Sequence, residues 1–129
     1  MKNAFSLLEL IFAIVVIGII SSFAIPKYMD IRNQAMASTI QRDIVTATTS
    51  IQSYYLVNRG IENISDAISL NDKNWIVTDL KATFKDGDSD CVYLEVKQKE
   101  IAITIYSTVG DVCKELDELG IKTLNIELI

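Results

Sequence analysis

The feature that most constrains this chain of 129 residues is a continuous apolar stretch from Phe5 to Ile25. About 20 consecutive apolar residues is the length at which an α-helix crosses the hydrocarbon core of a bilayer. Lys2 precedes the stretch, and a basic residue there favours retention of the extreme N-terminus in the cytoplasm. We therefore expect one membrane-spanning helix, with the rest of the chain on the extracytoplasmic side.

One acid, Glu9, lies a single turn inside this stretch and is its only ionisable side chain. A carboxylate in hydrocarbon costs on the order of 2.5–3.5 kcal/mol on insertion scales, which makes such a residue a functional candidate. No Lys or Arg within the stretch can pair with it. The simplest partner is an α-amino group created by cleavage of the chain nearby, on the same molecule or on a neighbour.

An ordinary secretory signal peptide is one alternative, with a small-residue cleavage site at 21–24 (Ser-Ser-Phe-Ala). Such a signal has a longer basic region and a shorter apolar core than this chain has. It also has no need for an acid near its start, so Glu9 disfavours it. The corresponding functional alternative is a secreted enzyme with a cleaved signal.

The segment 5–11, Phe-Ser-Leu-Leu-Glu-Leu-Ile, resembles the cleavage and methylation segment of type IV pilins and pseudopilins. In that family a prepilin peptidase removes a short basic leader just before a Phe, the new N-terminus is methylated, and a Glu stands fifth in the mature chain. The resemblance implies cleavage between Ala4 and Phe5, N-methylation of Phe5, and an assembly role for Glu9. The family usually has Gly before the cut, where this chain has Ala4.

Gly18 and Pro26 fall where this family usually has a helix-loosening glycine and a proline. Proline inside a helix removes a hydrogen bond, so we expect a kink or a local loosening at Pro26. The helical pattern then resumes to about Val57 and stops at 58–60 (Asn-Arg-Gly). Spacings of three, four or seven mark one apolar stripe, formed by Met29, Met36, Ile40, Ile44, Ala47, Ile51 and Tyr54.

Only the second half of this predicted helix has a polar face, so the first half must be surrounded by lipid or by other helices. We expect it to sit in the membrane before assembly and to pack among identical helices in a filament afterwards. The Glu9 carboxylate would then meet the Phe5 amino group of an adjacent subunit, which neutralises the acid and sets the axial register. The alternative is a plain membrane anchor with Glu9 near the interface.

The C-terminal half of the chain has the signals of a small antiparallel sheet. Residues 58–74 are expected to form a loop with a short helical turn at 65–70. Tyr54 and Tyr55, near the end of the long helix, are expected to contact the head from below as core and rim residues. A short helix should carry Val112, Leu116 and Leu119 on one face and stop at Gly120. The expected strands are 75–80, 91–97, 100–107 and 121–129. Residues 82–85 either extend the first of these strands or follow it, and a tight turn at 98–99 joins 91–97 to 100–107.

These elements together predict an α+β fold, in which a long N-terminal transmembrane and stem helix carries a small antiparallel head, as in pilins. The expected divisions are a leader peptide at 1–4, a transmembrane or filament-core half-helix at 5–25, an amphipathic stem at 26–57 and the head at 58–129. We expect three or four strands, packed on the stem.

Two cysteines, Cys91 and Cys113, suggest one disulfide in an oxidising, extracytoplasmic compartment. A bridge would close a loop of roughly twenty residues and contribute about 3 kcal/mol on the chain-entropy model. Two separate buried thiols are the alternative.

The acidic run 86–90 contains Asp86, Asp88 and Asp90, an alternation that resembles a calcium loop. An EF-hand would require Gly at Cys91 and an acid at Lys97, so we expect a solvated turn without a cofactor, calcium being the alternative. The chain has no histidine, no Gly-rich phosphate loop and no Ser/His/Asp or Cys/His set, which argues against an enzyme.

Charge adds a further constraint, because the net charge is −5 and the residues from Gly60 onward include fourteen acidic and seven basic side chains. An acidic head disfavours a broad nucleic-acid-binding surface.

The expected function is that of a structural subunit of a type IV pilus, a type II secretion pseudopilus or a DNA-uptake pseudopilus. The resemblance implies storage in the bacterial inner membrane and a periplasmic or extracellular filament, homo-oligomeric or mixed. It also implies prepilin peptidase/methyltransferase, an inner-membrane assembly platform and membrane lipid as partners. A head without proline disfavours a major secretion pseudopilin, whose calcium loop usually contains one. The alternative is a single-pass anchored extracytoplasmic binding protein.

Overall fold

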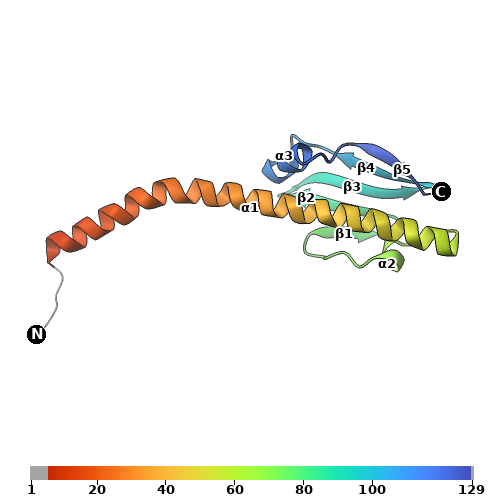
Figure 1. Ribbon diagram of the computed structural model, residues 1–129, viewed down its shortest axis with the longest axis horizontal. Coiled ribbons are helices and arrows are strands. Elements are labelled where there is room, and N and C mark those ends of the chain that lie inside the picture. Colours follow the sequence, from red (N-terminus) through yellow and green to blue (C-terminus); the bar gives the residue numbers. More distant parts are fainter. Residues whose placement is uncertain (1–5, 129) are drawn as a thin grey trace, which may run out of the picture. The chain divides into compact units, whose positions relative to one another are not determined.

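The computed structural model of this chain describes residues 6–128, which form one long helix, two short helices and a five-stranded sheet (Figure 1). The chain divides into two compact units, Met1–Arg32 and Asn33–Ile129. Helix α1 (Leu7–Asn58) contributes its first part to one unit and its second part to the other. The remaining elements belong to the second unit, and the α+β fold predicted from the sequence is confirmed.

Helix α1 continues through the only proline of the chain, Pro26. In a regular helix the carbonyl oxygen of Ser22 would accept a hydrogen bond from the N–H of residue 26. Pro26 has no N–H, so this hydrogen bond is missing. The Ser22 hydroxyl donates a hydrogen bond to the carbonyl oxygen of Ile19 at 2.7 Å. The loosening expected at this point stays a prediction.

The end of helix α1 lies at Asn58, one residue beyond the predicted end. Arg59 follows in the left-handed conformation, with φ of 61°, and its N–H donates to the carbonyl oxygen of Tyr55 at 2.7 Å. This conformation commonly terminates helices and is usually taken by glycine. The predicted stop is therefore confirmed, although Arg59 rather than Gly60 adopts the left-handed conformation.

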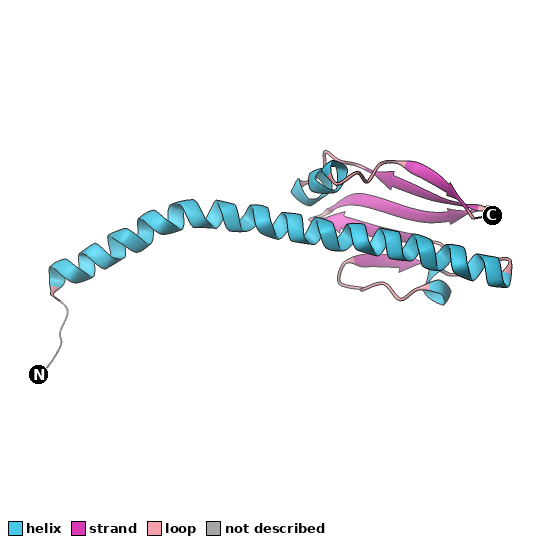
Figure 2. Ribbon diagram, viewed as in Figure 1, coloured by secondary structure: helices cyan, strands magenta, loops and turns pink. Residues whose placement is uncertain are grey.

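The sheet is an antiparallel meander in which the strands neighbour one another in chain order (Figure 2). It has one strand more than the largest number expected, because residues 81–86 form a strand of their own. A two-residue turn makes this possible, with Asp79 at a φ of 45° between paired Thr78 and Lys81. The strands are β1 (Trp75–Thr78), β2 (Lys81–Asp86), β3 (Ser89–Lys97), β4 (Glu100–Ile105) and β5 (Leu124–Glu127).

Two short helices complete the second unit. Helix α2 (Ile64–Ala67) is the helical turn expected between the stem and the sheet. Helix α3 (Asp111–Glu118) is the short amphipathic helix, and Gly120 follows it with a φ of 100°. Both helices are confirmed, but α2 begins one residue and ends three residues before the predicted turn at 65–70. In α3 the buried face holds Val112 and Leu116, whereas Leu119 follows the helix as its C-cap and is 41% exposed, so its predicted place on that face is wrong.

The hydrophobic core lies between one face of the sheet and the second part of helix α1. The predicted stripe is confirmed at Ile40, Ile44, Ala47 and Ile51, each at most 3% exposed. Ala37 joins it unpredicted, whereas Met29, in the first unit, is 45% exposed. The sheet contributes most of the other buried side chains, among them Ala82, Phe84, Val92, Leu94, Val96, Ile101 and Ile103.

Three polar side chains of helix α1 tie it to the head. The Trp75 indole N–H donates to a carboxylate oxygen of Asp43 at 2.9 Å. Gln41 and Gln52 donate through their side-chain amides to the carbonyl oxygens of Leu119 (3.3 Å) and Glu127 (3.4 Å). These bonds flank the core and fix which face of the helix meets the sheet, because hydrogen bonding is directional and apolar contact is not.

Candidate functional site: an apolar helix surface and its N-terminal acid

The first part of helix α1 exposes an apolar surface on all its sides. Leu7, Phe12 and Phe23 are 75%, 70% and 76% exposed, and no residue of its most apolar window is buried. This helix is long and apolar enough to cross a membrane. The exposed side chains between 7 and 25 are Leu7, Leu8, Leu10, Ile11, Phe12, Ile14, Val15, Val16, Ile17, Ile19, Ile20, Phe23 and Ile25.

Glu9 belongs to a hydrogen-bonded capping box at the start of this helix. The N–H of Ser6 donates to a Glu9 carboxylate oxygen at 3.3 Å, and the N–H of Glu9 donates to the Ser6 hydroxyl oxygen at 3.1 Å. The pattern Ser-x-x-Glu at a helix start is the sequence signature of this motif. This local partner of Glu9 was not predicted, because the expectations for the acid were a cation or a position near the membrane interface.

The capping box gives the carboxylate a local partner but leaves its charge without a cation within 4 Å in the described part of the chain. The cleavage and methylation predictions at Ala4 and Phe5 lie outside the described residues. Ser6 is covalently next to Phe5, so a cut before Phe5 would create an amino group one residue from the amide that Glu9 already accepts. The capping geometry is therefore compatible with a role for Glu9 beside a new N-terminus.

Gly18 has no steric reason to be glycine within this chain. A Cβ atom added there would meet nothing within 4 Å, and the backbone is helical. Glycine inside a helix is less stable than alanine by roughly 0.5–1 kcal/mol. The chain's own packing does not explain why this residue is glycine. A glycine here would allow another molecule to approach the helix closely, or would make the helix locally flexible.

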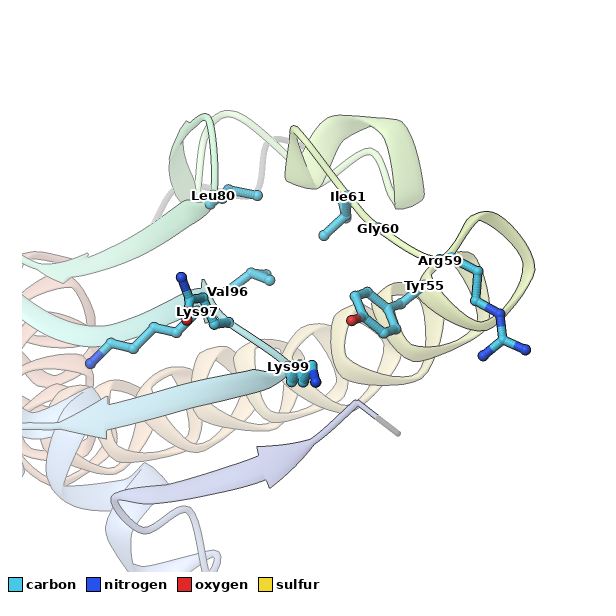
Figure 3. A pocket seen from close by; sticks show the side chains of 9 residues that line it. Tyr55, Arg59, Gly60, Ile61, Leu80, Val96, Lys97 and Lys99 are labelled. Carbon is cyan, nitrogen blue, oxygen red and sulfur yellow. The ribbon is translucent and has the colours of Figure 1, made fainter.

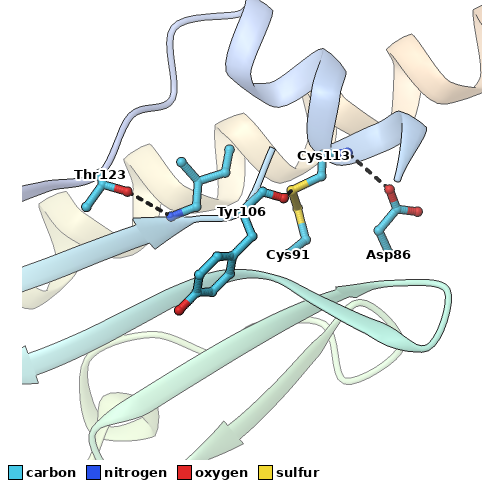
Figure 4. Close-up of a disulfide and its surroundings, with 6 residues drawn as sticks. Asp86, Cys91, Tyr106, Cys113 and Thr123 are labelled. Carbon is cyan, nitrogen blue, oxygen red and sulfur yellow. Dashed lines mark hydrogen bonds between the residues drawn. A yellow bond between two sulfur atoms is a disulfide. The ribbon is translucent and has the colours of Figure 1, made fainter. Parts of the chain in front are cut away.

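Cys91 and Cys113 form a disulfide, as predicted, and the bridge links strand β3 to helix α3 (Figure 4). Both residues are fully buried, and their Cα atoms lie 5.7 Å apart. Cys91 lies at a register irregularity between β2 and β3, where Phe84 pairs with Val92 and Lys85 with Asp90. This irregularity explains why two successive residues, Cys91 and Val92, are both buried.

Asp86 has a structural role that the local sequence does not predict. Its carboxylate accepts the N–H of Cys113 at 3.1 Å, in the first turn of helix α3 (Figure 4). The N-cap residue of that helix is Gly110, which has no side chain to do this. A Cβ atom on Gly110 would collide with the Asp86 carboxylate. Asp86 therefore caps a helix that starts 25 residues further along the chain, and no local sequence pattern predicts that Asp86 and this helix meet.

The other two aspartates of the acidic run have separate environments. Asp90 accepts the Tyr93 hydroxyl group and lies 3.8 Å from Lys85 Nζ. This hydrogen bond to Asp90, followed by desolvation and the aspartate charge, raises the pKa of Tyr93 to about 12, so Tyr93 is a neutral donor at ordinary pH. Asp88 is exposed at the hairpin turn. Over residues 6–128, no three acidic or cysteine side chains come together to hold a metal ion.

A groove at the far end of helix α1 was also not predicted (Figure 3). It has a volume of about 830 Å³. Tyr55, Ile61, Leu80 and Val96 form its apolar floor, and Gly60 and Gln98 complete the lining. Arg59, Lys97 and Lys99 stand on its rim, where Arg59 and Lys97 extend away from the centre (Figure 3). We call this the basic groove; Arg59 follows helix α1, whereas Lys97 and Lys99 belong to the β3–β4 hairpin, so sequence spacing alone could not bring Arg59 to the two lysines.

Comparison of the chain with known protein families, with curated proteins and with solved structures found no match.

Proposed function

We propose that this chain is the precursor of a structural subunit of a type IV filament, either a pilin or a pilin-like pseudopilin. A prepilin peptidase would cut it between Ala4 and Phe5 and methylate the new N-terminus. The mature chain would then enter a filament through the first part of helix α1. The observation that carries this proposal is an apolar helix surface, exposed on every side, with a single carboxylate one turn from its start.

The physical reason is that this surface has no partner within the chain. Side chains such as Leu7 and Phe23 gain free energy only in lipid or against other apolar helices. A filament of identical helices supplies the second environment, and the membrane supplies the first. Glycine at position 18, unexplained by the chain's own packing, supports close contact with a neighbour.

The acid supports the same proposal. In a filament core the Glu9 carboxylate needs a cation, and the described chain holds none within reach. The amino group of Phe5 on an adjacent subunit is the simplest source. We place the subunit in the bacterial inner membrane before assembly, with the head extracytoplasmic, and an assembly platform and other pilin subunits are its partners. The filament would serve adhesion and motility, secretion or DNA uptake.

The first test is the mass of the mature N-terminus. We expect mass spectrometry of the full chain, produced in cells with a prepilin peptidase, to find an N-methylated Phe5. Retention of Met1, or cleavage near Ala24, would contradict the proposal. This measurement does not depend on filament formation.

The second test separates charge from helix capping at Glu9. Glu9→Gln keeps an acceptor that suits a capping box but removes the charge, whereas Glu9→Ala removes both. Leaving a buried charge unpaired costs about 3–5 kcal/mol, so both variants should lower the yield of sheared filaments more than about tenfold. A Glu9→Gln variant that assembles like the wild type would show that Glu9 acts only as a cap.

A membrane-anchored extracytoplasmic binding protein is the second candidate, and the capping box favours it. Ser6 and Glu9 satisfy each other in a single chain, so the acid has a structural use without any neighbour. Crosslinking between the N-terminal helices of different copies distinguishes the candidates. An anchor would show none above the level expected from random encounter in the membrane, and no filaments would form.

A further inference from the structure

The two ends of the head differ in charge and in shape. In an antiparallel meander successive turns alternate between opposite ends of the sheet. The turns at 79–80 and 98–99 therefore lie at one end, together with the basic groove. The turn at 87–88 lies at the other end, where the acidic run 86–90 forms the tip of the β2–β3 hairpin.

The basic groove is unusual for this head. Residues from Gly60 onward carry twice as many acids as bases, yet the lining includes Arg59, Lys97 and Lys99 and no carboxylate. Within residues 6–128, none of the three cations has a carboxylate oxygen within 4 Å. Glu100 pairs with Lys97 across the hairpin ladder without forming an ion pair at that distance.

The hairpin tip at the opposite end has the complementary properties. Gly87 has a φ of 68° and no side chain, so the tip is narrow, and Asp88 beside it is exposed. Asp111 is also exposed, at the start of helix α3, where Gly110 adjoins the Asp86 carboxylate. Asp86 and Asp90 are held by bonds within the chain, which leaves Asp88 and Asp111 for an outside partner.

We propose that the basic groove binds the β2–β3 hairpin tip of a second copy of this chain. This inference rests on the proposed filament function and adds a contact between heads to the contact between helices. Charge complementarity selects the occupant, because one copy presents cations around an apolar floor and the next presents a narrow acidic tip. Such a head-to-tail contact uses two different surfaces, and repeated contacts of this kind build an open helical polymer rather than a closed dimer.

The test reverses the charge at each end separately and then at both. The full chain is produced in cells that assemble it, and sheared filaments are measured against processed subunit in the membrane. Like charges placed opposite each other across an interface are strongly unfavourable. Lys97→Glu with Lys99→Glu, and separately Asp88→Lys with Ser89→Lys, should each lower filament yield at least about tenfold. The chain with all four changes should regain most of the wild-type yield.

Lys73→Glu is the matched control, because Lys73 is exposed and lies in the loop before β1, outside the groove lining. It should leave the yield unchanged. Unchanged yield in the Lys97/Lys99 variant, or failure of the four-residue variant to recover, would overturn the inference. If those variants still show crosslinked N-terminal helices, the proposed filament stands without this contact. A wild-type chain that forms no filaments would overturn both.

Discussion

The two parts of helix α1 have the same backbone structure and different surroundings. From Leu7 to Arg32 the helix exposes large apolar side chains on every side. From Asn33 to Asn58 one apolar stripe is buried against the sheet, and most side chains outside it are polar, although Val45, Leu56 and Val57 are exposed. The difference shows that the two parts of one helix suit different environments. A part with one apolar stripe can pack that stripe on a sheet and expose its polar face to water, whereas a part that is apolar on all sides has no face suited to water.

Matched isoleucine-to-alanine substitutions in the two parts should give the largest difference. Ile40 is fully buried, and Ile40→Ala should lower the free energy of unfolding by about 2–5 kcal/mol. Ile14 is 61% exposed, and Ile14→Ala should leave head unfolding unchanged. Unfolding of the full chain in detergent can be followed by the fluorescence of Trp75, the only tryptophan, which is 2% exposed. An equal loss of unfolding free energy in the two variants would show that the two parts of the helix do not differ in their contribution to the stability of the head.

Removal of the helix cap should have an intermediate effect, confined to the second unit. Asp86→Ala deletes the acceptor for the Cys113 N–H and should destabilise the head by about 1 kcal/mol. Asp88→Ala is the control, because Asp88 is exposed and makes no side-chain hydrogen bond among the described residues. Thermal unfolding of both variants measures the difference, and equal melting temperatures would show that Asp86 does not stabilise the head as a helix cap.

The smallest effect is expected for Gly18→Ala. In the isolated chain the change meets no atom and favours the helix by roughly 0.5–1 kcal/mol. Head unfolding should not change. If Gly18 admits a neighbouring helix or a local loosening, filament yield should fall, and membrane insertion should not. Unaltered assembly would show that neither use applies.

Sequence patterns predicted much of the fold because those patterns are local. The stem stripe, the turn at 98–99 and the last short helix follow from spacing within a few residues. The sequence left open whether 82–85 extends the strand at 75–80 or follows it as a separate strand, and the left-handed conformation of Asp79, which separates β1 from β2, decides for the second. The capping box is also local, because the pattern Ser-x-x-Glu at 6–9 is its sequence signature.

By itself, the sequence determined that the chain has one helix fit for a membrane, an acid near its start, a buried stripe further along, and two cysteines suited to a bridge. Only the tertiary structure decided that Asp86 caps helix α3 and that Arg59, Lys97 and Lys99 surround one groove. The physical reason is range. Periodicity and capping act over a few residues, whereas these contacts join segments that are far apart in the chain and meet only after the sheet has packed on the helix.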